Sequence, residues 1–259
     1  MAFTEARRYF VERRVEDRMS ATQSLSFVSY FARLRANIDS EIEKLINAST
    51  VNETYFYREE HQFACLTSDL LPERLRVKPR GETLRIWSVP CSTGEEPYSI
   101  AIWLLENWPE VDQHEVEIVA SDIDTNVLNA ARAGIFGQRA LMRMSKQLID
   151  KYFVAAGAEQ WLILDDLRQS IHFTAANVVQ AAETRPQGVF DIIFCRNMLI
   201  YFDDASRRIA AENLYECLAP GGYVCLGHAE SMSRISPLFE VCRFADAVVY
   251  RKPMETSRG

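Results

Sequence analysis

The sequence predicts an α/β protein, in which a doubly wound and mainly parallel sheet follows a small all-helical N-terminal domain and carries a small β-subdomain insertion. Two observations support this prediction. From about Leu84 onward, short apolar runs alternate with helical segments, as strands and crossover helices do in parallel sheets. Before Leu84 this alternation is absent, and the first 50 residues have apolar side chains at helical spacing.

The helical spacing at the N-terminus predicts one buried face on each of two helices. The two apolar sets follow the i, i+3, i+4, i+7 pattern. They are Phe27, Tyr30, Phe31 and Leu34, then Ile38, Ile42, Leu45 and Ile46. No proline or glycine occurs before Pro72, so we expect the helical part to pack directly on the sheet domain.

Short apolar runs bounded by turn residues predict the strands. We expect five main strands over residues 84–89, 116–122, 170–178, 190–197 and 223–228, and a closing antiparallel pair over 239–244 and 247–252. We expect helices from about Thr93, from Ile123 to about Gly134, and from 203 to a Pro-Gly-Gly stop at 220–222. The alternation breaks between Gly137 and Ser170, where WLILDD (161–166) is typical of one arm of a hairpin, which indicates an insertion.

Composition narrows the class of protein. The chain has 259 residues, a length that fits one large domain or one large and one small domain. Of these residues 48% are hydrophobic and 25% charged, as in an ordinary globular protein. No apolar run approaches the roughly 20 residues of a membrane span, and the N-terminus is charged where a signal peptide is apolar. The six cysteines lack metal-ligand spacing. We therefore expect a cytoplasmic protein with no membrane insertion and no metal.

The charge is distributed unevenly along the chain. Residues 1–35 have seven arginines and four acidic residues, a net charge of +3, so the chain's net charge of −7 leaves −10 for the remainder. Arg7, Arg14 and Arg18 fall within roughly 40° of one another on a helix. Such a stripe suits an acidic partner, but composition alone favours a solvated helix face.

Ligands of doubly wound sheets bind at the carboxyl ends of the strands. The loop after the first strand has a single glycine, Gly94, and lacks the glycine patterns that bind dinucleotides or nucleoside triphosphates. Its glutamates, Glu95 and Glu96, suit a cation instead. Thr93 and Glu96 also have capping-box spacing, so Glu96 as a helix cap is an open alternative.

Asp122 ends the second strand, where a carboxylate typically accepts hydrogen bonds from ribose hydroxyls. It could instead cap the following helix, for which Asp124 is an equally good candidate. A cationic nucleoside without phosphate, such as S-adenosylmethionine, fits these loops.

Five long runs in a fixed order resemble the CheR-type chemoreceptor glutamate methyltransferases. They are NETYFYREEHQF (52–63), RIWSVPCSTGEEPYSIAI (85–102), ASDIDTNVLNAARAGIFG (120–137), FDIIFCRNMLIYFD (190–203) and LAPGGYVCLGHAES (218–231). The resemblance implies a helical receptor-docking domain (1–50) and a Rossmann-like methyltransferase domain (51–259) with a β-subdomain inserted at about 138–172. It implies methyl transfer from S-adenosylmethionine to glutamate carboxylates on the cytoplasmic helices of chemoreceptors. The products are γ-methyl esters, which serve sensory adaptation, and S-adenosylhomocysteine.

By the same resemblance, particular residues acquire roles. The cofactor contacts are Asn52, Thr54, Arg58, Glu96, Asp122, Asn177, Val178, Arg196 and Asn197. Arg58 and Tyr201 match the positions that face the reacting centre. From position alone, Arg58 would be a surface ion pair with Glu59 or Glu60, and Tyr201 a core aromatic residue. Arg7, Arg14 and Arg18 correspond to the basic helix that docks on receptor helices.

The sequence departs from the family at three places. The N-terminal domain is short, which weakens the docking prediction. The insertion is shorter than in members that tether to a receptor's C-terminal peptide, so we expect a pentapeptide-independent protein that does not tether. We also expect a monomer. Cys91 replaces a smaller residue, and we expect it to line the cofactor pocket.

Two other functions stay open as alternatives. One is a methyltransferase of the same fold with another substrate. Nucleic acid is disfavoured as that substrate by the run R-N-M-L-I-Y (196–201), where such enzymes have N-P-P-Y, and by the net charge of −7. The other is a non-catalytic signalling module that binds S-adenosylmethionine.

Overall fold

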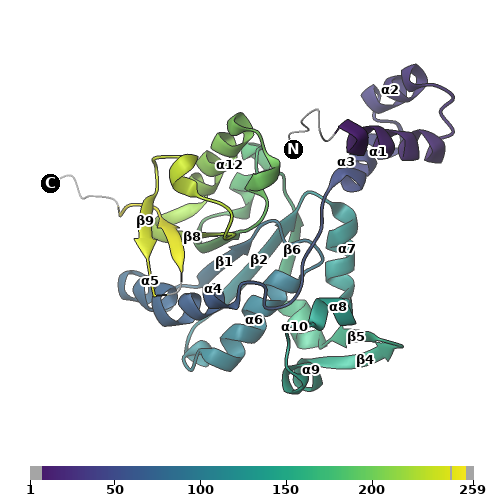
Figure 1. Ribbon diagram of the computed structural model, residues 1–259. Coiled ribbons are helices and arrows are strands. Elements are labelled where there is room, and N and C mark those ends of the chain that lie inside the picture. Colours follow the sequence, from purple (N-terminus) through teal and green to yellow (C-terminus); the bar gives the residue numbers. More distant parts are fainter. Residues whose placement is uncertain (1–7, 246, 255–259) are drawn as a thin grey trace.

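The computed structural model describes residues 8–245 and 247–254 (Figure 1). The described chain has three parts: three N-terminal helices, a seven-stranded sheet covered by helices, and a three-stranded antiparallel sheet. Figure 1 shows the small sheet below α10 and the first two helices projecting from the opposite end of the molecule, with α3 beside α7. Within these residues, no helix has both the length and the apolar character needed to cross a bilayer.

The N-terminal part contains α1 (Arg8–Ala21), α2 (Phe27–Arg35) and α3 (Glu41–Ser49). Helix α2 begins at a capping box, in which the Ser26 hydroxyl accepts a hydrogen bond from the Ser29 backbone N–H and the Ser29 hydroxyl accepts one from Ser26. The expected helices are therefore present in this part of the chain.

The prediction that the apolar face of each of these helices is buried is wrong. Phe27 and Phe31 are 58% and 48% exposed and stack on each other, and Ile42 is 43% exposed. Tyr30 is the residue of α2 that is buried, and its contact is polar, because its hydroxyl donates a hydrogen bond to Glu41 (3.0 Å). Three short helices offer too little apolar surface to cover α2 on the side away from α3.

An ion pair between Arg18 and the buried Glu41 lies between the helices of the N-terminal part. Arg18 donates two hydrogen bonds, each 2.9 Å long, to the two oxygens of the buried Glu41 carboxylate. Hydrogen bonds from Arg18 outweigh burial and lower the pKa of Glu41. Because α1, α2 and α3 each supply one member of this cluster, its three side chains fix the helices relative to one another.

The main sheet has the strand order β6-β2-β1-β7-β8-β10-β9. Its strands are β1 (Leu84–Ser88), β2 (Val116–Asp122), β6 (Ile171–Ala175), β7 (Phe190–Cys195), β8 (Leu218–Leu226), β9 (Glu240–Arg243) and β10 (Val248–Arg251). The first five are parallel, and β9 and β10 form an antiparallel pair, so the predicted sheet is confirmed. The direction of winding reverses between β1 and β7, which places the ligand-binding crevice at their carboxyl ends.

Strand β7 shows how the sheet separates two cores. All six of its residues are buried; Ile192 and Phe194 pack towards α6, while Ile193 and Cys195 pack towards α12. The helices on the first side are α4 (Glu60–Cys65), α5 (Leu71–Val77), α6 (Glu95–Asn107) and α7 (Thr125–Ala133), with a π-helical turn (Leu66–Leu70) between α4 and α5. Helix α12 (Asp204–Glu216) covers the second side.

Several expected boundaries differ from the structure by two residues or more, and three of them bear on the loops around the sheet. The third main strand ends at Ala175 instead of 178, helix α6 begins at Glu95 instead of Thr93, and β8 begins at Leu218 instead of Tyr223. Residues 220–222 therefore belong to a strand and do not close α12. They fit there because the pairing of β7 with β8 is irregular between Phe190 and Ile192, and a Cβ on Gly222 would lie 2.8 Å from a β7 carbonyl oxygen.

The small sheet contains β3 (Ile135–Gly137), β5 (Gln160–Ile163) and β4 (Phe153–Gly157), in that spatial order. Strand β5 pairs with β4, which confirms that the WLILDD run supplies one arm of a hairpin. The short helices α8 (Gln138–Leu141), α9 (Lys146–Tyr152) and α10 (Asp165–Ser170) surround this sheet, and α11 (Ala181–Thr184) follows β6.

The ion pair in the helical part yields a prediction. Glu41→Ala should lower the opening free energy of α1–α3 by about 2 kcal/mol, since Arg18 and Tyr30 both lose a buried partner. Hydrogen exchange of the amides in residues 8–49 measures this change, with the amides of β7 as the internal reference. Glu12→Ala, which breaks the exposed Arg8–Glu12 pair, is the control and should have an effect below about 1 kcal/mol. Equal exchange in the two variants would contradict the prediction.

Candidate functional site

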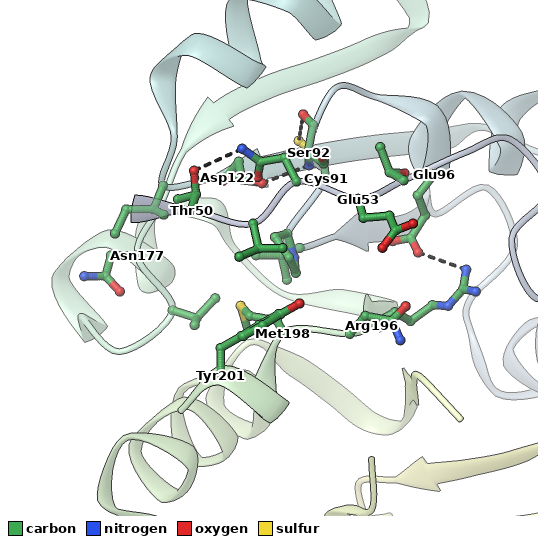
Figure 2. Close-up of a pocket in the computed structure, with 18 of the residues that line it drawn as sticks. Thr50, Glu53, Cys91, Ser92, Glu96, Asp122, Asn177, Arg196, Met198 and Tyr201 are labelled. Carbon is green, nitrogen blue, oxygen red and sulfur yellow. Dashed lines mark hydrogen bonds and ion pairs between the residues drawn. The ribbon is translucent and has the colours of Figure 1, made fainter. Parts of the chain in front are cut away.

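A cavity of about 390 Å³ lies at the carboxyl ends of β1, β2, β6 and β7 (Figure 2). Its volume is within the roughly 300–1,000 Å³ that is usual for small-molecule sites. Residues 50–55, which we call the strap, leave α3 and line the cavity. The cavity is therefore formed by the crevice that the strand order predicts and by one extended segment from the N-terminal side.

The structure brings together every residue that the resemblance assigns to the cofactor and the reacting centre. Those lining the cavity are Asn52, Thr54, Arg58, Glu96, Asp122, Asn177, Val178, Arg196, Asn197 and Tyr201. The arginines assigned to docking lie elsewhere: Arg14 and Arg18 are in α1, and Arg7 lies outside the described residues.

The end of β2 contributes two carboxylates with different contacts. Asp122 is buried and accepts hydrogen bonds from the backbone N–H groups of Ser92 (2.8 Å) and Asp124 (3.0 Å). Burial raises its pKa, although these N–H groups oppose the shift. Asp124 is the cap of α7, because it accepts from the N–H groups of Asn126 and Val127. The alternative in which Asp122 caps this helix is therefore wrong, and Asp122 faces the cavity.

Asp124 also holds the strap. Its second oxygen accepts hydrogen bonds from the Thr50 hydroxyl (2.5 Å) and from the side-chain amide of Asn52 (3.0 Å). One buried carboxylate thus joins the start of α7 to the segment that lines the cavity opposite the sheet. Asn52 is expected to contact the cofactor, and Asp124 fixes where its side chain lies.

The loop after β1 turns Glu96 into the site. Gly94, with φ +97°, precedes α6 and packs against the ring of Tyr98, where a Cβ would lie 3.0 Å from a ring carbon. The capping box of Thr93 and Glu96 is wrong, since the Thr93 hydroxyl donates to Glu95 instead (2.6 Å). Glu96 points away from the start of the helix and accepts from Ser88 (2.8 Å).

Cys91 lines the cavity, as expected from the sequence. Its side chain is buried, and burial together with nearby carboxylates, above all Asp122, raises the pKa of the thiol well above its ordinary value. A thiol in this environment is protonated at neutral pH and is a small apolar wall, not a nucleophile.

Arg196 joins two glutamates beside the cavity. Its guanidinium lies 3.0 Å from the Glu96 carboxylate and 3.3 Å from that of Glu59, and it donates to the Arg58 carbonyl (2.6 Å). Burial raises the pKa of Glu96 against the effect of Arg196. Burial also opposes ionisation of Glu59, but Arg196 and His228 outweigh it and hold the pKa of Glu59 below its usual value.

Tyr201 and Met198 lie across the cavity from Asp122 and Ser92, and the Tyr201 hydroxyl points inward (Figure 2). Both belong to the segment that follows β7, in which Asn197 has the left-handed φ of +57° and residues Leu199–Tyr201 form a 3-10 turn. The left-handed residue turns the chain sharply out of the sheet, so that this segment lines the cavity.

Arg58 lies beyond the strap, where it donates a hydrogen bond to the Glu53 carbonyl (2.8 Å) and lies over the Tyr55 ring (5.8 Å). Among the described residues these contacts replace the expected surface ion pair with Glu59 or Glu60. The guanidinium therefore belongs to the wall of the cavity.

The loop after β6 supplies Asn177 and Val178. The backbone N–H of Asn177 donates to Glu183 (2.9 Å), and its side-chain oxygen accepts from the Val179 N–H (3.2 Å), which fixes the turn. Val178 is buried and presents an apolar surface to the cavity.

Sequence reasoning missed the groups that hold this site together: the strap role of Asp124, the ion pair of Glu59 with Arg196, and a contact of Glu230 with the segment after β7. The runs S-D-I-D and G-H-A-E-S contain two of them, but a run does not show what its side chain touches. Among the described residues there is no group of three His, Cys, Asp or Glu side chains suited to a metal.

Residues 1–50 match the all-alpha domain of the CheR methyltransferases, and residues 52–248 match the SAM (S-adenosylmethionine) binding domain of that family. The chain belongs to the CheR methyltransferase family. It is 48% identical to "Chemotaxis protein methyltransferase 2" of Vibrio cholerae, over 97% of this chain and 87% of that protein. It is 37% identical to "Chemotaxis protein methyltransferase 2" of Pseudomonas aeruginosa, over 92% and 84% of the two chains.

A third relative, the "Chemotaxis protein methyltransferase" of Salmonella typhimurium, is 36% identical over 91% of this chain and 80% of its own length. The predicted family is thus confirmed, and with it the Rossmann-like methyltransferase fold. This CheR-family chain is a SAM-dependent methyltransferase of chemotaxis.

The side chains of the cavity fit SAM. Three acidic residues, Glu53, Glu96 and Asp122, line the cavity together with two basic ones, Arg58 and Arg196, which leaves one excess negative charge when all are ionised and suits a cationic ligand. Within the described part of the chain, the buried Ser92 hydroxyl at the cavity has no hydrogen-bond partner, so it is available to a polar ligand.

The double contact of Asp124 can be tested. Asp124→Ala should lower stability by about 2 kcal/mol and speed amide exchange in residues 47–54, because it removes both the cap and the strap contact. Thr50→Val is the matched control: it keeps the cap and should change exchange in the strap without changing exchange in α7. Denaturant unfolding and hydrogen exchange measure the two effects. If Asp124→Ala leaves strap exchange unchanged, the carboxylate does not hold the strap.

Proposed function

We propose that this CheR-family protein transfers the methyl group of SAM to glutamate side-chain carboxylates on the cytoplasmic helices of chemoreceptors. The products would be S-adenosylhomocysteine and glutamate γ-methyl esters that serve sensory adaptation. The single observation that supports this most is the cavity, which gathers the ten residues expected at the cofactor and reacting centre from four loops and the strap.

When bound, SAM supplies a methyl group on a positively charged sulfonium. Asp122 would accept hydrogen bonds from the ribose hydroxyls, as carboxylates at the end of the second strand do in this fold. Glu96 would stabilise a bound cationic ligand, because its buried carboxylate is paired with a single guanidinium, that of Arg196. Asn52, Asn177 and Asn197 also line the cavity and would contribute to its polar surface.

The acceptor needs no general base. A glutamate carboxylate has an ordinary pKa of about 4.3 and is ionised at neutral pH, so no proton has to be removed before it reacts. The protein has to remove water from the carboxylate and orient it. Arg58 would attract the carboxylate by charge, and the Tyr201 hydroxyl, which points into the cavity, would orient it by a hydrogen bond.

We also propose that the helices of residues 1–50 dock on the receptor. Arg14 lies over the Phe10 ring (4.8 Å), and Arg18 pairs with Glu41 while its side chain stays 21% exposed. Both guanidiniums thus have structural contacts, and docking would use the charge that still faces the solvent. Contacts of this kind weaken with salt. Arg7 lies outside the described residues, so its docking role stays a sequence prediction.

Several expectations remain predictions beside this proposal. They are the monomeric state, the lack of tethering to a receptor's C-terminal peptide, and the domain division at residues 50 and 51 with an insertion at about 138–172. The expectations that the reaction uses neither a metal nor nucleic acid have the same status. A receptor-tail peptide that binds with micromolar affinity would overturn the second.

The proposal is tested by transfer of labelled methyl from SAM to purified receptor cytoplasmic fragments. We expect label on the receptor that is released by mild base, because carboxyl methyl esters hydrolyse whereas methylated amines do not. Base-stable label would indicate another acceptor, and absence of label would favour a non-catalytic module that binds SAM. A receptor fragment with glutamine at its methyl-accepting positions is the matched control and should stay unlabelled.

Two substitutions should separate the roles of the cavity residues. Arg58→Ala should lower kcat about 100-fold, because the acceptor carboxylate loses its orientation. Asp122→Ala should mainly weaken the binding of SAM and raise its Kd at least about tenfold, since a charged hydrogen-bond acceptor is lost. Methyl-transfer kinetics and calorimetric titration with SAM measure these effects. The exposed Arg143→Ala is the control, and activity of Arg58→Ala equal to wild type would remove Arg58 from the mechanism.

A further inference from the structure

Glu230 joins two loops next to the cavity without lining it. One oxygen of its carboxylate accepts hydrogen bonds from the backbone N–H groups of Asn197 (2.7 Å) and Gly227 (2.9 Å). The other oxygen accepts from the N–H of Ile200 (3.3 Å). The segment after β7 and the turn after β8 are therefore held by a single side chain.

The two loops are also in direct contact. A Cβ on Gly227 would lie 2.5 Å from the side-chain nitrogen of Asn197 and 3.0 Å from its backbone nitrogen. Any residue other than glycine would push the segment after β7 away from β8. This contact allows one carboxylate to reach backbone donors on both loops.

The bonded segment carries side chains of the site. Asn197 lies at the left-handed bend, Ile200 is the second residue of the 3-10 turn, and Tyr201 ends that turn. Asn197 and Tyr201 line the cavity, whereas Glu230 does not. By fixing the N–H groups at positions 197 and 200, the carboxylate holds both the bend before the turn and the middle of the turn that presents the Tyr201 hydroxyl.

We propose that Glu230 is a positioning residue for methyl transfer, which acts by holding residues 197–201 so that the Tyr201 hydroxyl faces the acceptor. The role of Tyr201 rests on the proposed function; the loop contact itself does not.

The contact requires a carboxylate. One of its oxygens accepts two N–H groups and the other accepts a third, whereas a glutamine side chain has a single acceptor oxygen. In Glu230→Gln, an amide NH2 would face at least one backbone N–H, and the turn would have to shift. Burial raises the pKa of Glu230, opposed by the backbone N–H groups, which agrees with a carboxylate held inside the protein by amides.

A double-mutant cycle tests the proposal. Glu230→Gln and Tyr201→Phe should each lower kcat about tenfold to a hundredfold, with KM for the receptor changing less than about threefold. The double variant should be no slower than the slower single variant, because Glu230 acts through Tyr201. Effects that multiply in the double variant would overturn the proposal, since they would show independent actions.

Three further measurements separate positioning from loss of fold. In the wild type, the amides of Asn197, Ile200 and Gly227 should resist hydrogen exchange, and Glu230→Gln should remove this protection from at least one of them without changing that of β7. Val249→Ala, a buried truncation in β10, two strands away from β7 in the sheet, is the stability control and should lower Tm without lowering kcat. Glu212→Gln, an exposed glutamate on α12, is the charge control.

Rapid exchange of the Asn197 amide in the wild type would overturn the inference even if no Glu230 variant folds. If the wild type labels no receptor, the proposed function fails, and amide exchange still reports whether Glu230 holds the loops. The two failures are therefore distinguishable.

Discussion

The Asp124 carboxylate is the interaction on which the site depends. It caps α7, fixes the strap through Thr50 and Asn52, and its own backbone N–H donates to Asp122. Each contact joins a different element, so this one buried residue aligns the end of β2, the start of α7 and the wall formed by residues 50–55. A capping aspartate normally stabilises a helix by about 1 kcal/mol. Here the same oxygens also set the geometry of a ligand cavity.

The charges around the cavity follow from the chemistry that we propose. Burying carboxylates costs free energy unless they are paired, and Arg196 is shared between Glu59 and Glu96, while Asp122 is held by backbone N–H groups. This arrangement is poor for a phosphate and good for a cation. No strong base is needed beside Tyr201, because methyl transfer to an ionised carboxylate requires only orientation and removal of water.

The sheet, and the edge at which Glu96 and Asp122 meet, could be predicted from local patterns in the sequence, whereas the other site residues were predicted from the resemblance to the family. Apolar runs such as residues 190–195 predict buried strands, and parallel strands bring their following loops to one edge. The failures have a common cause. Whether a face of α2 is buried, or whether Glu96 caps a helix, depends on side chains that are distant in the sequence. Tyr30 of α2 turns towards Glu41 and leaves Phe31 exposed, and Glu96 pairs with Arg196 instead of capping α6. The Thr50–Asp124 contact spans 74 residues, a separation at which no local pattern carries information.

The route from the N-terminal helices to the cavity is short and is anchored on the way. Helix α3 leads directly into the strap, and before the strap begins, the Asn47 side chain already donates to the Thr125 hydroxyl at the start of α7 (2.9 Å). The next anchor is Thr50 on Asp124. Glu43 of α3 is a further anchor on the start of this helix, since its carboxylate accepts a hydrogen bond from the Thr125 hydroxyl (2.5 Å). Because α3 and the strap are both held at the start of α7, the wall formed by residues 50–55 keeps its place beside the end of β2, and the cavity keeps the geometry that methyl transfer requires.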